Sequence, residues 1–282
     1  MSKARKEIVC VIGLGVIGLP VAQHVKKHYR TVGWDLERDA CERAIKKGVP
    51  SGGWNSGDKP FVADIYVVAV NTWFRNAAPD MSAVWACCQE ISEWNPNSLV
   101  CFESTLYPGT ARSIAERFGL KHVVVCPHRY WSEDPENYGV TQLRVFGALN
   151  PASREEGRIF YSELGIPLHL LSSLEMAEAT KIVENSHRYL QIAYAEEMRV
   201  MAEKNGLNFD ELRESVNTKW NVKIPLALRG IGGTCLPKDI QYLLSLYPSP
   251  LLLGALKADE DYREFLSMAP LPKNRRKTLE AQ

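Results

Sequence analysis

The chain has 282 residues, of which 45% are hydrophobic and 24% charged, and its formal net charge is +1 at pH 7. This composition excludes a disordered or collagen-like chain, and the balanced charge gives no electrostatic reason to expect nucleic acid or a membrane as a partner. The seven cysteines are scattered, with neither a C-x-x-C pair nor zinc-site spacing. We therefore expect no metal and a reducing, cytoplasmic location.

The first part of the chain alternates short apolar segments with amphipathic ones. Helical patterns occur, for example, at 81–93 and 110–117. Strands are predicted at 8–12, 31–34, 65–70, 99–102, 123–126, 144–147 and 168–171. This alternation predicts an α/β fold of the Rossmann type, a doubly wound and mostly parallel sheet, over residues 1–171.

The rhythm changes after residue 171. A helix start at 172–175 is followed by neither Gly nor Pro until Gly206, which predicts one long helix over 173–205 ending at a glycine cap. Further helices are predicted at 210–218, from about residue 236, and at 251–265. Residues 172–266 should thus form an all-α domain, and the basic segment 267–282 a disordered tail.

A glycine-rich turn follows the first predicted strand. Gly13, Gly15 and Gly18 form G-x-G-x-x-G between a strand and a helix, and Asp35 ends the second strand. This pattern indicates a dinucleotide site, with the pyrophosphate at the helix N-terminus and Asp35 on the ribose hydroxyls, which favours NAD over NADP. The residues expected to bind NAD are Gly13, Gly15, Val16, Ile17, Gly18, Asp35, Arg38, Val70, Thr72, Ser104 and Thr105.

A second glycine-rich segment, residues 230–239, reads G-I-G-G-T-C-L-P-K-D. Its glycines permit backbone conformations closed to other residues, and Pro237 suits the first turn of a helix. Cys235 should therefore lie at a helix N-terminus beside Lys238, and both the helix dipole and the cation favour its thiolate form. The other six cysteines are predicted to be inert packing residues.

Together these motifs resemble the UDP-glucose/GDP-mannose dehydrogenase family over residues 7–262. The family's remaining motifs are S-T-x-x-P-G-T, here 104–110, and a lysine and an asparagine on the long helix, here Lys181 and Asn185. The resemblance implies oxidation of a primary alcohol of a sugar or nucleotide sugar to a carboxylate by two NAD in succession. It also implies a homodimer through the 173–205 helix, for which Tyr189, Ile192, Ala193 and Met198 are candidate surface positions.

The chemistry of the residues agrees with that implication. After a first hydride transfer, the Cys235 thiolate attacks the aldehyde; the thiohemiacetal loses a second hydride, and water hydrolyses the thioester. Lys181 and Asn185 are four residues apart, so a cation and an amide can converge on one substrate oxygen. Thr105 and Asp239 match family positions that hold or activate the water.

The sequence departs from the family in three places. After the third strand, Asn71-Thr72-Trp73 stands where the family has T-P, at a turn expected to border the cofactor. After the strand at 123–126 the family usually has Pro-Glu, whereas here Pro127 precedes His128, a candidate general base or substrate-binding residue. The family's further α/β domain, which grips the nucleotide, is expected to be missing. Substrate contacts are expected from His128, Arg129, Tyr130, Lys181, Asn185, Gly232 and Gly233.

Two alternative functions remain. One is a two-electron dehydrogenase resembling the β-hydroxyacid dehydrogenases, which share the Rossmann domain and the lysine-plus-asparagine helix but lack the cysteine segment. The other is an NAD-binding regulator without catalytic activity. One NADH per turnover, independent of Cys235, would mark the first; NAD binding without turnover would mark the second.

Overall fold

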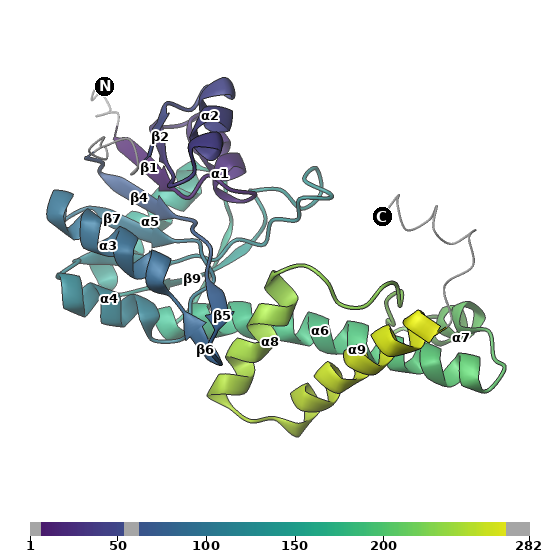
Figure 1. The fold of residues 1–282 in the computed structure, drawn as a ribbon. Helices are drawn as coiled ribbons and strands as arrows, with labels where there is room; N and C mark the ends of the chain where they lie inside the picture. The colour runs from purple at the N-terminus through teal and green to yellow at the C-terminus, as the bar shows by residue number, and fades with distance from the viewer. Residues whose placement is uncertain (1–6, 54–61, 269–282) are drawn as a thin grey trace. The chain divides into compact units, whose positions relative to one another are not determined.

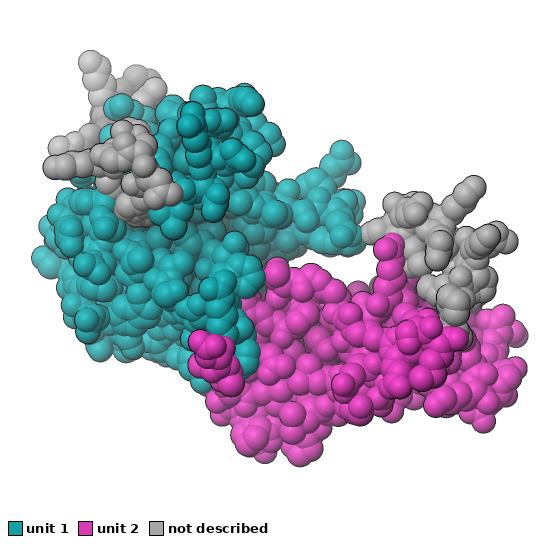
Figure 2. All heavy atoms as spheres, viewed as in Figure 1, with its two compact units in different colours: residues 1–75, 79–181 teal, residues 76–78, 182–282 magenta. Residues whose placement is uncertain are grey.

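The structure is a computed structural model that describes residues 7–53 and 62–268 (Figure 1). It forms two compact units: residues 1–75 with 79–181, and residues 76–78 with 182–282 (Figure 2). The sequence predicts the change of architecture at 171/172, whereas the units divide inside the long helix α6 (Leu174–Lys204), after Lys181. The reason is that the first turns of α6 bond to the sheet unit, through Glu175 to Arg112 and Glu178 to Gly109.

The first unit is built on an eight-stranded sheet with the order β10-β9-β8-β7-β4-β1-β2-β3. All neighbouring strands are parallel except β8 and β9. This confirms the predicted α/β class with a mostly parallel sheet. The strands are β1 (Ile8–Ile12), β2 (Arg30–Trp34), β3 (Ser51–Gly52), β4 (Ile65–Val68), β7 (Leu99–Phe102), β8 (His122–Val125), β9 (Arg144–Ala148) and β10 (Leu168–Leu170).

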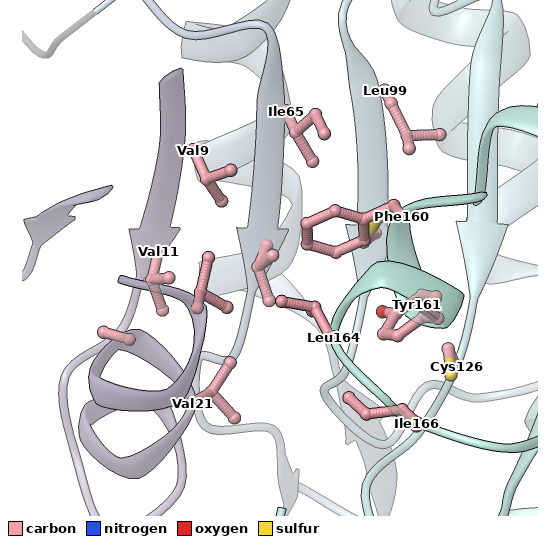
Figure 3. Close-up of a cluster of buried hydrophobic side chains, with 14 of the residues drawn as sticks. Val9, Val11, Val21, Ile65, Leu99, Cys126, Phe160, Tyr161, Leu164 and Ile166 are labelled. Atoms are coloured by element: carbon pink, nitrogen blue, oxygen red, sulfur yellow. The ribbon is translucent and has the colours of Figure 1, made fainter. Parts of the chain in front are cut away.

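Helices cover both faces of this sheet (Figure 1). The helices are α1 (Gly18–Val25), α2 (Arg38–Lys46), α3 (Ser82–Trp94), α4 (Thr110–Phe118) and α5 (Pro151–Glu163), and a hairpin of β5 (Trp73–Arg75) and β6 (Ala78–Asp80) follows β4. On one face, Val21 of α1 and Phe160 of α5 share one buried cluster with Val11, Ile65 and Leu99 of the strands (Figure 3). Covering both faces explains why the central strands are continuously apolar instead of alternating.

The order of the strands fixes where a ligand can bind. From β1 the chain moves to β2 and β3 on one side, then returns to β4 on the other side. The strand order therefore reverses between β1 and β4, and in open α/β sheets the crevice at the carboxyl ends of such strands is the ligand site.

The second unit is helical. It contains the rest of α6 with α7 (Phe209–Val216), α8 (Cys235–Leu246) and α9 (Pro250–Met268). The predicted long helix is thus confirmed to within one residue at each end, and its cap Gly206 has the positive φ of 68° that favours glycine. Of the predicted basic tail, residues 267 and 268 belong to α9, and the remainder lies outside the described residues.

The apolar side chains of α6 divide between two faces. Tyr189 and Ala193 are each 2% exposed and pack with α8 and α9 inside the unit, where Ile192 packs partly against the same cluster. Met198 packs partly against a second cluster, with Ala195 and Phe209. Tyr189 and Ala193 are thus buried inside the unit, whereas Ile192 and Met198 are half-buried, and a dimer surface on α6 stays a prediction. Within the described residues, no helix is long and apolar enough to cross a membrane.

Candidate active site

The glycine turn lies at the end of β1, in the crevice just described. Gly13 has φ of 89°, and a Cβ there would lie 2.7 Å from the carbonyl oxygen of Ala69, after β4. A Cβ at Gly18 would lie 1.7 Å from the carbonyl oxygen of Gly13. Both glycines are thus required by the protein's own backbone.

Gly15 differs from its two neighbours in the motif. A Cβ at this exposed position would meet nothing within 4 Å, and its φ is not in the left-handed region. The packing of the chain therefore gives no reason for glycine here, whereas a ligand approaching the backbone closely would. Next to it, Val16 is 67% exposed at the same turn.

Helix α1 begins at Gly18, directly after this turn, and its first turn carries no acidic residue. Within that first turn Leu19 N already donates to Gly15 O at 3.2 Å, and Pro20 has no N–H. The main contribution of the first turn is therefore the partial positive charge of the helix dipole. This combination fits a pyrophosphate.

Asp35, at the end of β2, anchors the glycine turn. Its Oδ2 accepts a hydrogen bond of 2.5 Å from Leu14 N, and its Oδ1 accepts one of 2.8 Å from Glu37 N. An ionised carboxylate has about four acceptor positions, so this half-buried group can still accept from two ribose hydroxyls. Arg38, the residue that could favour a 2′-phosphate, is instead ion-paired with Glu42 on its own helix at 2.9 Å.

Two loops complete this side of the crevice. Ser104 Oγ donates to Val70 O at 2.7 Å, and Thr72 Oγ1 donates to Thr105 O at 2.8 Å. These bonds tie the loop after β4 to the loop after β7. The structure thus gathers the predicted cofactor residues at the carboxyl ends of neighbouring strands, with Arg38 alone engaged elsewhere.

The loop after β7 is also pinned to α6 by a residue that the sequence analysis missed. Glu178 Oε2 accepts from Gly109 N at 2.6 Å, and its Oε1 accepts from Ala111 N at 2.8 Å. Burial raises the pKa of this carboxyl to about 7. A signal was available, because the S-T-x-x-P-G-T turn begins a helix whose free N–H groups need an acceptor.

His128 follows β8 and is half-buried. Burial, and then the nearby cations Lys181 and Arg144, hold the pKa of His128 well below its usual value, so the ring is neutral at pH 7. Tyr130 N donates to His128 Nδ1 at 3.3 Å. That bond assigns the remaining proton to Nε2, which makes the ring a hydrogen-bond donor through that atom.

The residues that follow His128 form a loop that is held by side-chain hydrogen bonds. Arg129 Nη1 donates to Leu143 O at 2.8 Å, and Gln142 Nε2 donates to Arg129 O at 2.7 Å. Tyr130 lines a pocket of about 640 Å³ between this loop and α1. Behind the loop, Arg144 forms a fully buried ion pair of 2.8 Å with Glu103, a pair that the sequence analysis did not single out.

In the second unit, Cys235 is exposed and is the first residue of α8. The other six cysteines are buried, and burial raises the pKa of each of their thiols. Gly233 has φ of 74°, and a Cβ at Gly232 would meet nothing within 4 Å. The thiol thus lies beside an open, glycine-lined stretch of backbone at a helix N-terminus.

One turn further along α8, Asp239 is completely buried and bonds α8 to α6. Its Oδ1 accepts from Lys238 Nζ at 2.6 Å, its Oδ2 accepts from Asn185 Nδ2 at 2.5 Å, and Ser186 Oγ donates to its carbonyl oxygen at 3.3 Å. We call Asn185, Ser186, Lys238 and Asp239 the Asp239 cluster. The Lys238 cation pairs with Asp239 and lies 4.3 Å from the Tyr242 ring centroid, and its predicted influence on the thiol stays a prediction.

The structure thus groups the predicted catalytic residues in two sets. His128 lies near Lys181 in the first unit, and Asn185 bonds Asp239 in the second, on the helix that carries Cys235. Lys181 and Asn185 lie four residues apart on α6, which carries both onto one helix face. Each carboxylate oxygen of Asp239 already holds a protein donor, and the predicted role of Asp239 and Thr105 toward water stays a prediction.

Comparisons with known proteins match the two parts of the chain to two different domain families. Residues 8–125 match the NAD binding domain of 6-phosphogluconate dehydrogenase, and residues 175–252 match the central domain of the UDP-glucose/GDP-mannose dehydrogenase family. The UDP-N-acetyl-D-mannosamine dehydrogenase of Pyrococcus horikoshii is 28% identical over 268 residues, which cover 84% of this chain and 64% of that protein. The UDP-N-acetyl-D-glucosamine 6-dehydrogenase of Pseudomonas aeruginosa is 26% identical over 281 residues, covering 87% and 66%.

Solved structures of nucleotide-sugar dehydrogenases are also similar to this chain. The UDP-N-acetylmannosamine dehydrogenase structure from P. horikoshii matches with a TM-score of 0.82 at 26% identity, covering 92% of this chain and 70% of that one. A 3-hydroxyisobutyrate dehydrogenase of Mycobacterium tuberculosis shares the fold, with a TM-score of 0.72 at 16% identity, and is covered over 94% of its length.

The fold and the glycine turn define a class of protein, the NAD-binding dehydrogenase fold, with a Rossmann domain and a helical domain. NAD is the cofactor of this chain. Within this class, residues 175–252 match the central domain of the UDP-glucose/GDP-mannose dehydrogenase family, which the chain resembles. The chain spans 64% of the length of the curated P. horikoshii relative.

Proposed function

We propose that the protein oxidises a primary alcohol of a nucleotide sugar to a carboxylate, with Cys235 as the nucleophile. The observation that carries this proposal is the exposed Cys235 at the start of α8, in a segment bonded to α6 through Asp239 and Asn185. A cysteine that served only packing would be buried, as the other six are. The relatives named for UDP-N-acetyl-D-mannosamine and UDP-N-acetyl-D-glucosamine make these two sugar nucleotides the substrates to test first.

The cofactor residues fit NAD. The open backbone at Gly15, the positive end of the α1 dipole and the remaining acceptor positions of Asp35 are suited to a pyrophosphate and an adenosine ribose. When bound, NAD supplies the hydride acceptor for each of the two oxidation steps. The first step converts the alcohol to an aldehyde.

Cys235 then forms a covalent intermediate. Its thiolate adds to the aldehyde carbon to give a thiohemiacetal, and removal of hydride from that carbon leaves a thioester. Water adds to the thioester carbonyl, the C–S bond breaks, and the thiolate is released with the carboxylate product. Without the sulfur, the second oxidation would have to act on an aldehyde hydrate.

Lys181 and Asn185 serve the substrate oxygen in this proposal. Asn185 donates one Nδ2–H to Asp239, which orients the amide and leaves its second N–H for an oxygen that becomes negatively charged. The Lys181 cation stabilises the same charge. His128, neutral and protonated on Nε2, acts as a hydrogen-bond donor to substrate in place of the family's glutamate, which favours its substrate-binding role over that of general base.

Replacement of Cys235 tests the nucleophile. With either sugar nucleotide, Cys235→Ser should block acid formation, and the matched variant Cys87→Ala, at a buried cysteine of α3, should form acid at the wild-type rate. Acid formation at the wild-type rate by Cys235→Ser would refute the thioester mechanism. One NADH per substrate in both proteins would instead identify a two-electron dehydrogenase.

A homodimer through α6, in a reducing cytoplasm, belongs to the same proposal. Met176, Val183, Tyr194 and Met201 are 49, 49, 52 and 37% exposed. Their spacings of 7, 11 and 7 residues put them within about 20° of one another around the helix. This exposed apolar stripe, instead of the positions expected from the sequence, is the surface on which a second copy would pack.

A further inference from the structure

Helix α9 holds the backbone just before the cysteine segment. Asp259 Oδ1 accepts from Ile231 N at 2.7 Å, and Arg263 Nη2 donates to Ile231 O at 2.5 Å. The two side chains are joined, because Arg263 Nε also donates to Asp259 Oδ2 at 3.1 Å. Both backbone polar groups of Ile231 are thus bonded by one Asp–Arg pair, which we call the Asp259 clamp.

The neighbouring glycines show where the clamp ends. Gly230 has φ of 92°, and a Cβ there would lie 3.0 Å from Cγ, Nε and Cζ of Arg263, so the arginine lies against this glycine. Beyond Ile231, by contrast, Gly232, Gly233 and Thr234 are exposed, and a Cβ at either glycine would meet nothing within 4 Å. Ile231 and the N-cap residue Thr234, whose carbonyl oxygen accepts from Lys238 N at 3.3 Å, are therefore the bonded points on either side of the two open glycines before Cys235.

Two further buried side chains, Tyr189 and Glu196, lie around Asp259. Tyr189 OH donates to Asp259 Oδ2 at 3.1 Å. Glu196 is completely buried nearby, and burial followed by the Asp259 carboxylate raises the pKa of Glu196 to about 8, against the opposing effect of Arg263. At neutral pH Glu196 thus carries a proton and adds no second negative charge beside Asp259.

The chain before the clamp is held from α6 and α9 as well. Arg199 Nη1 donates to Ala227 O at 3.0 Å, and Tyr262 OH donates to Leu228 O at 2.9 Å. These backbone carbonyls lie in a loop without regular secondary structure, so side-chain donors, here a guanidinium and a phenol, satisfy them. The clamp is the member of this series nearest to Cys235.

We infer that Asp259 and Arg263 are positioning residues for Cys235: by fixing Ile231 they set the conformation of the glycines that present the thiol at the start of α8. This inference rests on the proposed function of Cys235. Neither side chain needs to touch substrate, because each acts through the backbone of the cysteine segment.

Hydrogen–deuterium exchange and thiol alkylation test this inference on the full chain without a substrate. In Arg263→Ala, and in Asp259→Ala, the Ile231 amide, which donates to Asp259, should exchange at least about tenfold faster, as the loss of a hydrogen bond to a charged group predicts. The rate and the pH profile of Cys235 alkylation by iodoacetamide should change as well, and Arg263→Lys should restore part of both. Arg263 is half exposed, so its variants test the clamp even if Asp259→Ala does not fold.

Asp261→Asn is the matched control, because Asp261 forms an exposed ion pair of 2.9 Å with Lys257 on the same helix. It should leave exchange, alkylation and turnover unchanged. With nucleotide sugar, the clamp variants should lower kcat by about tenfold with an unchanged KM for NAD. Wild-type exchange and alkylation in a folded Arg263→Ala would overturn the inference. Acid formation by Cys235→Ser would refute the proposed function alone, since neither exchange nor alkylation depends on turnover.

Discussion

Replacing Asp239 with asparagine breaks the Asp239 cluster with little change in side-chain volume. Asp239 is completely buried and accepts from both Lys238 and Asn185, and an amide has only one oxygen with which to accept. Its NH₂ group would then face either the Lys238 ammonium, which only donates, or the Asn185 amide, which now donates through Nδ2 and would have to turn its Oδ1 toward the new NH₂. The substitution leaves the Lys238 cation, whose side chain is 11% exposed, without its carboxylate.

The size of the effect follows from this burial. Removing one partner of a buried ion pair costs about 3–5 kcal/mol. The lower end applies here, because Lys238 keeps its contact with the Tyr242 ring and a narrow route to solvent. We therefore expect Asp239→Asn to lower the free energy of unfolding of the helical unit by about 3 kcal/mol, or roughly two orders of magnitude in the equilibrium constant.

Hydrogen–deuterium exchange of the α8 amides measures this loss directly in the helical unit, and urea unfolding followed by circular dichroism measures it in the whole chain. A double-mutant cycle with Lys238→Met isolates the pair: in that background Asp239→Asn should cost at least about 1 kcal/mol less. A loss below about 1 kcal/mol for Asp239→Asn, or strict additivity in the cycle, would refute the reasoning.

Three further predictions concern the cofactor turn, α6 and assembly. Gly15→Ala should weaken NAD binding, measured by calorimetry, by at least about tenfold and leave the melting temperature unchanged. Gly13→Ala should lower the melting temperature, because Gly13 has φ of 89°. An NAD affinity of Gly15→Ala equal to that of the wild type would contradict the role of Gly15. The pKa of Glu178 is raised from 4.5 to about 7, so between these pH values the folded state binds more protons than the unfolded state. The free energy of unfolding should therefore fall as the pH rises from 4.5 to 7, by about 2–3 kcal/mol relative to Glu178→Gln in urea titrations. Parallel curves of stability against pH for the two proteins would count against this prediction. Val183→Asp in the exposed stripe of α6 should give monomers in sedimentation where the wild type sediments as a dimer, and a wild-type monomer would exclude the interface.

The sequence predicted the elements whose pattern is continuous and capped. Helix α6 was placed to within one residue because no Gly or Pro interrupts it before Gly206, and β1 was placed without error because it is a run of apolar residues between charged and glycine residues. Helices α2 and α5 were not singled out. For α5 a signal existed, since Asn150 precedes Pro151 and its side chain accepts from Ser153 N at 2.9 Å, an N-cap pattern readable from sequence.

Other features depend on three-dimensional contacts that periodicity does not report. The antiparallel pairing of β8 and β9 follows from a connection without a crossover helix, and this sheet edge was not anticipated. Tyr189 and Ala193 of α6 are buried inside the unit and not at its surface. This helix has apolar residues on two faces, and its pattern alone does not say which face packs on α8 and α9.

The candidate site likewise has local features that the sequence predicts and distant contacts that it does not. The roles of Gly13 and Gly18 could be predicted because the turn is local, and the structure gives each glycine a backbone contact that excludes a side chain. The bond between Asn185 and Asp239 joins residues 54 positions apart, and the clamp of Asp259 on Ile231 joins residues 28 positions apart. No local pattern specifies such pairs, since any buried carboxylate on either helix would look the same in the sequence.

The number of NADH molecules formed per carboxylate product tests the central claim most directly. With UDP-N-acetyl-D-mannosamine or UDP-N-acetyl-D-glucosamine as substrate, absorbance of NADH and chromatography of the sugar nucleotide measure both quantities in one reaction. A four-electron oxidation through Cys235 predicts two NADH per acid and no released aldehyde. One NADH per product, with an aldehyde or ketone accumulating, would contradict it.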